Sequence, residues 1–163
     1  MKFRRLTREE LEPLENELKQ FLIINGVHGE EWEKINKENP ARANELVDIF
    51  SDTVLQKVYE KIEFLEHRSI PTCMVFRCWT DQIELIVLQK KPETAVDLST
   101  PESIHHALIS QLDSLTFYTS SRRYSKAREQ EIHQLLEQGC LLSTRDFWQQ
   151  LNALTLDKRT QHN

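Results

Sequence analysis

Glycine and proline are scarce in this chain of 163 residues, which contains three glycines and five prolines. Folds built from many strands joined by tight turns depend on these two residues, so an all-β fold is not expected. The chain also lacks a glycine-rich phosphate-binding loop, which argues against a nucleoside triphosphatase. Hydrophobic residues still make up 39% of the sequence, enough to build a core and too many for disorder throughout.

Cysteine is equally rare, and the three present are Cys73, Cys78 and Cys140. So small and odd a number does not form a disulfide framework and is typical of a reducing compartment. No apolar run approaches the roughly 20 residues that span a bilayer. No apolar segment follows the basic N-terminus, as a signal peptide would require. We therefore expect a cytoplasmic protein that does not enter the membrane.

Net positive charge is missing overall, because the chain carries a formal charge of −5. A general attraction to nucleic acid or to an anionic membrane surface is therefore not expected. The charge is uneven, however, and residues 122–163 hold seven basic and five acidic side chains. This net-positive part is where a site for an anionic partner is best sought.

Helix signals dominate the first 66 residues. Thr7 and Glu10 form a capping-box pattern at the start of a helix, and Pro13 must kink that helix or mark its true first turn. Gly26 can adopt the left-handed conformation that ends it. Asn39 and Pro40 then predict the start of the longest helix, which an apolar stripe extends to about Glu66.

Strand signals follow in residues 72–79 and 83–90, which are rich in β-branched and aromatic residues and form a predicted hairpin. Both faces of these strands carry apolar side chains, so we expect much of both faces to be covered. Residues 115–119 predict a third short strand. The expected fold is α+β, with a small, mostly antiparallel three-stranded sheet (the hairpin plus one further strand) surrounded by about six helices. We predict one domain over residues 1–156 and a frayed polar tail over residues 157–163.

Four cations gather after the third strand, where a helix capped by Ser125 is predicted to begin. A helix N-terminus carries partial positive charge, so each cation there costs roughly 0.3–1 kcal/mol unless an anion offsets it. Hydroxyl groups and free helix N–H groups are suited to bind phosphate or carboxylate. We predict that these residues bind an anionic ligand or partner: Ser120, Ser121, Arg122, Arg123, Tyr124, Ser125, Lys126 and Arg128. In the alternative interpretation, the cations pair with Glu129 and Glu131 on a solvated loop.

Other chemistry has less support in the sequence. The six histidines form no HExxH motif, and Cys73 and Cys78 would face opposite sides of a strand. Glu63, Glu66 and His67 would share one face of the predicted long helix, which is more simply its solvated face. We therefore expect no metal and no cofactor.

Four segments carry a resemblance to a known family: KFRRLTREELEPLE near the N-terminus, EEWEK at 30–34, FSD at 50–52 and LEHRS at 65–69. Together they make the chain similar to an uncharacterised family of small bacterial proteins, a domain of unknown function, over most of its length. The resemblance implies a small bacterial soluble protein and supplies no activity or catalytic residue.

Two functions are expected from these observations. The first is a non-catalytic cytoplasmic interaction or regulatory module. It would recognise an anionic ligand or protein partner through the basic segment, residues 120–128. The alternative is a small enzyme that acts on a phosphorylated or carboxylated substrate at the same segment. Nucleic acid is disfavoured as a partner by the net charge, and the sequence indicates no particular oligomeric state.

Overall fold

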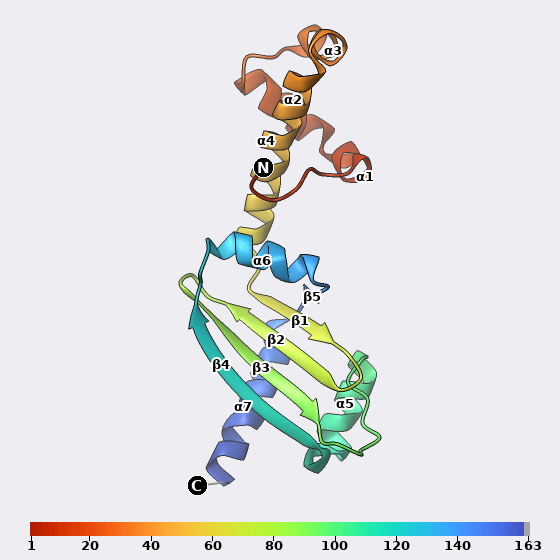
Figure 1. The fold of residues 1–163 in the computed structure, drawn as a ribbon, viewed down its shortest axis with the longest axis vertical. Coiled ribbons are helices and arrows are strands. Elements are labelled where there is room, and N and C mark those ends of the chain that lie inside the picture. Colours follow the sequence, from red (N-terminus) through yellow and green to blue (C-terminus); the bar gives the residue numbers. More distant parts are fainter. Residues whose placement is uncertain (162–163) are drawn as a thin grey trace. The chain divides into compact units, whose positions relative to one another are not determined.

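The computed structural model describes residues 1–161. The chain folds as two compact units, one comprising Met1–Lys61 and the other beginning at Ile62. The first unit is helical and contains, in chain order, α1 (Arg8–Leu11), a 3-10 turn (Glu12–Leu14), α2 (Glu15–Ile24), α3 (Gly29–Glu38) and α4 (Pro40–Glu60) (Figure 1).

The predicted helix signals of the first unit are confirmed. The Thr7 side chain accepts a hydrogen bond from the Glu10 N–H (3.2 Å), and Glu10 accepts one from the Thr7 N–H (2.9 Å), which completes the capping box. Pro13 lies in the 3-10 turn that separates α1 from α2. Gly26 has a φ of +79°, and the Asn39 side chain caps α4 by accepting from the Arg42 N–H (3.2 Å).

The predicted end of the long helix is wrong. α4 ends at Glu60, whereas the sequence pattern extended it to about Glu66, and Phe64–Arg68 forms strand β1 instead. Phe64 and Leu65 continue the apolar spacing of the helix, but in the structure they are buried through antiparallel pairing with a neighbouring strand. Tertiary pairing has therefore overridden the local periodicity.

The second unit is built on a five-stranded sheet in which each neighbouring pair is antiparallel. The α+β class is confirmed, but the predicted three strands are too few. The strand order is β4-β3-β2-β1-β5. The remaining strands are β2 (Thr72–Cys78), β3 (Gln82–Lys90), β4 (Leu115–Arg123) and β5 (Leu141–Leu142). The hairpin of β2 and β3 is confirmed, and β5 consists of two residues, too few to produce a strand pattern.

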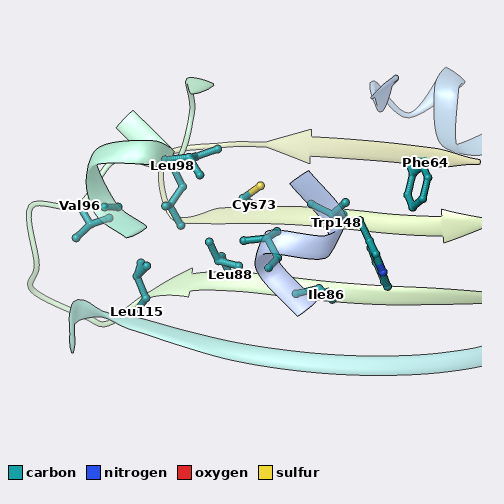
Figure 2. Packing of buried hydrophobic residues seen from close by; sticks show 12 residues of the cluster. Phe64, Cys73, Ile86, Leu88, Val96, Leu98, Leu115 and Trp148 are labelled. Carbon is teal, nitrogen blue, oxygen red and sulfur yellow. The ribbon is translucent and has the colours of Figure 1, made fainter. Parts of the chain in front are cut away.

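Two helices cover one face of this sheet, namely α5 (Pro101–Ser110) and α7 (Arg145–Gln161) (Figure 1). Val75 and Ile86 are directly paired across β2 and β3 and are 0% and 1% exposed on this face. Ile104 of α5 and Trp148 of α7 belong to the same buried cluster, which Figure 2 shows from close by.

The opposite face of the sheet is covered in part, and less of it is covered than the sequence predicted. Phe76 and Leu85 face each other across β2 and β3 and are half-buried. Cys78 and Ile83 on the same face are buried, and they lie at the end of the sheet where α6 (Arg128–Glu137) is found (Figure 1).

The C-terminal helix is longer than expected. α7 continues to Gln161 and so includes residues 157–161, which the sequence analysis assigned to a polar tail. Residues 162–163, the rest of that predicted tail, lie outside the described residues.

Candidate functional site

Strand β4 extends four residues beyond the predicted strand and takes in half of the predicted binding residues. It continues to Arg123, pairing Arg122 with Ile83 and Arg123 with Gln82 of β3. Successive side chains of a strand point to opposite faces. Ser120 and Arg122 therefore share one face of the sheet, while Ser121 and Arg123 share the other, and these four residues do not converge on one point.

The helix after this strand starts later than predicted and without the expected cap. α6 begins at Arg128, and its N-cap residue Ala127 makes no side-chain hydrogen bond. Ser125, the predicted cap, instead lies within hydrogen-bond distance (3.3 Å) of Oε1 of Glu131. The hydroxyl thus contributes to a side-chain cluster and leaves the helix start uncapped by a side chain.

Arg122 is held by an ion pair that the sequence analysis considered as the alternative. Its Nη1 donates to Oε1 of Glu131 at 2.9 Å. The Arg122 side chain is 56% exposed, whereas that of Glu131 is only 6% exposed. The other carboxylate oxygen of Glu131 is buried without a hydrogen-bond partner. Arg122 therefore offsets the charge of a buried carboxylate while part of its guanidinium remains at the surface.

Arg128 bonds to the backbone at the ends of two strands. Its Nη2 donates to the carbonyl of Ile62 and to that of Cys78 (3.1 Å), and its Nε donates to the carbonyl of Trp79 (3.0 Å). The side chain is 13% exposed. Hydrogen bonds from a charged donor are the stronger kind, so Arg128 connects the start of α6 to the end of β2 and to the residues before β1.

Tyr124 reaches the same backbone group as Arg128. Its hydroxyl donates to the carbonyl of Trp79 at 2.8 Å, and burial raises the pKa of the Tyr124 phenol. This geometry gives Tyr124 a structural role beside Arg128. It was predicted from its place next to the basic residues, and the sequence contains no signal for its bond to Trp79.

The predicted binding residues thus divide into three groups. Arg122 and Ser125 meet at Glu131, and Tyr124 and Arg128 meet at the carbonyl of Trp79. Arg123 and Lys126 are exposed, and neither makes an ion pair within the described part of the chain, while Ser120 and Ser121 are exposed on β4. Binding of an anion by this segment stays a prediction.

The position of β4 in the sheet was not predicted from the sequence. Within the described residues β4 is the last strand of the sheet, and no further strand pairs with its outer side. Residues 115–127 contain no acidic side chain and three cations, Arg122, Arg123 and Lys126. The absence of acidic residues was visible in the sequence, but the strand order that makes β4 an edge was not.

The cysteines and the other side chains that could ligate a metal do not form a metal site within the described residues. All three cysteines are free and buried. Burial raises the pKa of Cys73 to about 12 and that of Cys78 to about 11. Across the described residues, no three His, Cys, Asp or Glu side chains are grouped so as to hold a metal ion. Among the same residues, no helix is both long and apolar enough to cross a membrane.

These features define an α+β protein with a helical first unit and an antiparallel sheet whose last strand, β4, ends in basic residues. Residues 1–156 match the family of unknown function DUF6495, and the chain belongs to that family. The resemblance to an uncharacterised family is thereby confirmed. No curated protein and no solved structure matches the chain.

Proposed function

We propose that this protein is a non-catalytic interaction module of the bacterial cytoplasm, whose partner is an extended acidic segment of another protein. In this proposal the segment adds as a further strand at the basic end of β4, beside Ser120–Arg123. The observation that carries the proposal is that β4 is the last strand of the sheet formed by the described residues and that its basic end is exposed. The buried, free cysteines are in keeping with a reducing compartment.

Backbone groups supply the affinity in this kind of binding. An edge strand presents a row of N–H and C=O groups that can pair with another chain, and strand addition to such an edge is a common way to recognise peptides. β4 is longer than the usual five or six residues of a strand. It contains no proline, a residue with which proteins often block an edge.

The positive charge at the end of β4 favours an acidic partner. Arg123 and Lys126 lie exposed at the end of β4 and just after it, and Arg122 is half-exposed beside them. An acidic segment complements these cations and speeds association through long-range attraction. A second copy of β4 in the same place supplies no acidic residue, since residues 115–127 have none. Charge complementarity therefore favours a different, acidic chain over self-association.

The alternative of a small enzyme needs several cations to converge on one phosphate or carboxylate. Arg122 and Arg128 bond instead to Glu131 and to backbone carbonyls, and Ser120 and Ser121 point to opposite faces of β4. This arrangement favours binding along the strand over catalysis at one point.

The proposal is tested with a labelled eight-residue peptide that alternates Glu with Val or Thr, measured by fluorescence anisotropy. We expect saturable binding that weakens as salt is raised. The double variant Arg123→Glu with Lys126→Glu should bind at least tenfold more weakly. Lys91→Glu, which changes an exposed lysine after β3, is the matched control and should bind as the wild type does.

Two further peptides separate strand addition from simple charge attraction. A peptide of the same sequence with alternate backbone nitrogens methylated cannot pair with a strand edge and should not bind. A peptide with Lys in place of Glu should not bind either. Equal binding of the methylated and unmethylated peptides would refute strand addition, and equal binding by the double variant and the Lys91→Glu control would refute the location.

A further inference from the structure

A cleft of about 260 Å³ lies on the helix-covered face of the sheet, between α5 and α7 and beside β1. It is independent of the β4 edge and shares no residue with it. Its lining includes two charged side chains of β1, the exposed His105, and apolar side chains of the two helices, among them Ile104, Leu108 and Phe147; the charged pair is Glu66 and Arg68. Glu66 was predicted on a helix, so this arrangement was not expected from the sequence.

Strand geometry brings the two charges to the cleft. Glu66 and Arg68 are two residues apart on β1, so they point to the same face of the sheet. The Nε of Arg68 donates to Oε2 of Glu66 at 2.8 Å, and the two side chains are only 18% and 11% exposed. Removing an ion pair from water is costly unless further hydrogen bonds satisfy its remaining donors and acceptors.

The described residues do not supply those further hydrogen bonds. Among the described residues, no group accepts a hydrogen bond from the two terminal nitrogens of Arg68, and none donates to Oε1 of Glu66. A guanidinium with free terminal N–H groups is suited to bind a carboxylate through two parallel hydrogen bonds. The free carboxylate oxygen of Glu66 is suited to accept from an ammonium group.

The walls that the helices contribute are mainly apolar, with His105 and Gln150 as their polar members. Ile104 is buried and belongs to the main core cluster, and Leu108 and Phe147 pack against that cluster as partly buried side chains. Apolar walls with a few polar groups that set the orientation are typical of small-molecule sites. Sites for drug-sized ligands measure roughly 300–1,000 Å³, so this smaller cleft suits a small metabolite.

We propose that this cleft binds a free hydrophobic α-amino acid. The carboxylate of the ligand bonds to the terminal nitrogens of Arg68, and its ammonium group bonds to Oε1 of Glu66. The side chain of the ligand packs against Ile104, Leu108 and Phe147. A zwitterion suits the site better than a simple anion or cation does, because either single charge would be repelled by one member of the Glu66–Arg68 pair.

The test is isothermal titration calorimetry of the full chain with L-leucine and L-phenylalanine, supported by melting temperatures. We expect saturable binding of at least one of them and a rise in Tm, because a ligand that binds only the folded state stabilises it. N-acetyl-L-leucine lacks the ammonium group and L-leucinamide lacks the carboxylate, so each should bind at least tenfold more weakly than L-leucine. Glycine at equal concentration measures the general effect of amino acids on Tm.

Variants locate the site. Arg68→Gln should reduce leucine affinity at least tenfold, whereas Arg42→Gln, which breaks an exposed ion pair with Glu45 on α4, should leave it unchanged. If Arg68→Gln does not fold, His105→Trp at the exposed rim narrows the cleft without touching the core, and it should reduce leucine affinity while leaving the Tm of the free protein unchanged.

Three results would overturn the proposal. The first is no saturable heat and no rise in Tm beyond that caused by glycine, at 10 mM L-leucine or L-phenylalanine. The second is equal affinity for L-leucine and its two blocked analogues. The third is equal affinity of the wild type and the variant at Arg68, or at His105 where that variant replaces it. Peptide binding at β4 is a separate measurement, so either proposal can fail alone.

Discussion

The planar guanidinium of Arg128 donates hydrogen bonds to three backbone carbonyls, those of Ile62, Cys78 and Trp79. Hydrogen bonds that involve a charged group contribute about 1.5–3 kcal/mol each in favourable cases, and an acceptor left unpaired in the interior adds a cost. Tyr124 donates to the same Trp79 carbonyl. At the scale of single residues, part of the basic segment therefore stabilises the fold.

Replacing Arg128 by alanine is expected to lower the free energy of unfolding by about 3 kcal/mol, because several carbonyls lose a charged donor at once. Arg128→Lys should recover little of this, since one ammonium cannot reproduce the fork of the guanidinium. Urea unfolding followed by circular dichroism measures the change. Arg123→Ala is the matched control and should shift stability by less than about 0.5 kcal/mol, as exposed substitutions usually do. Equal losses in both variants would contradict the role assigned to Arg128.

The buried thiols lead to a prediction about pH. Burial raises the pKa of Cys73 to about 12 and that of Cys78 to about 11. A thiol in the unfolded chain ionises near pH 8.5, so above that pH the unfolded state releases protons that the folded state keeps. Stability should therefore fall as pH rises from about 9 to 11, and be unaffected by these thiols below about pH 8.

Thiol labelling checks the same point directly. At pH 8 a thiol-specific reagent should react only slowly with the native protein, because all three cysteines are buried. After denaturation the reagent should label three thiols, because all three cysteines are free. Rapid labelling of two or more thiols in the native state would show that the sheet end near Cys78 opens easily. Only one reactive thiol after denaturation would indicate a disulfide.

The two faces of the hairpin differ at the scale of elements. On β3, Ile86 points to the face covered by α5 and α7 and is 1% exposed, while its neighbour Leu85 points to the other face and is half-buried. Alternation along one strand therefore places two similar aliphatic side chains in different surroundings. The chain itself shows apolar residues on both faces and so does not reveal which one is covered.

Alanine substitutions at Ile86 and Leu85 measure how much the side chains on the two faces contribute to stability. Ile86→Ala should lower the free energy of unfolding by about 2–5 kcal/mol, as for other large-to-small changes in a packed core. Leu85→Ala should cost less than about 2 kcal/mol, because part of its side chain already contacts water. Chemical denaturation of the two variants gives both values. If the two losses were the same, the half-exposed face would have to be covered in solution.

At the scale of the whole molecule, each unit has a hydrophobic cluster of its own. Leu22, Val27 and Leu46 form one in the helical unit, and the cluster around Val75 and Trp148 lies entirely within the second unit. All five strands also belong to the second unit. A unit with its own core and its own complete sheet has the features of an independently folding domain.

A chain that starts at Glu60 and contains the second unit is therefore expected to fold without the first. Its far-ultraviolet circular dichroism should show β-sheet, and its urea unfolding should be one cooperative transition. The full-length chain is the reference. A gradual, non-cooperative transition of the shorter chain would show that the sheet depends on residues 1–59.

The sequence by itself determined the features that depend on neighbouring residues. The capping box of Thr7 and Glu10, the start of α4 at Asn39 and Pro40, and the β2–β3 hairpin are encoded within a few residues, so local signals sufficed to predict them. The family could also be inferred from short segments.

Only the tertiary structure decided the features that depend on distant partners. Phe64–Arg68 fits a helical pattern and becomes a strand because β2 pairs with it. Arg122 and Arg128 look like a cluster in the sequence. In the structure Arg122 bonds to Glu131, whereas Arg128 bonds to the carbonyls of Ile62 and Cys78. Strand pairing and burial draw their free energy from residues far apart along the chain, and for that reason no local pattern revealed the β4 edge or the cleft beside β1.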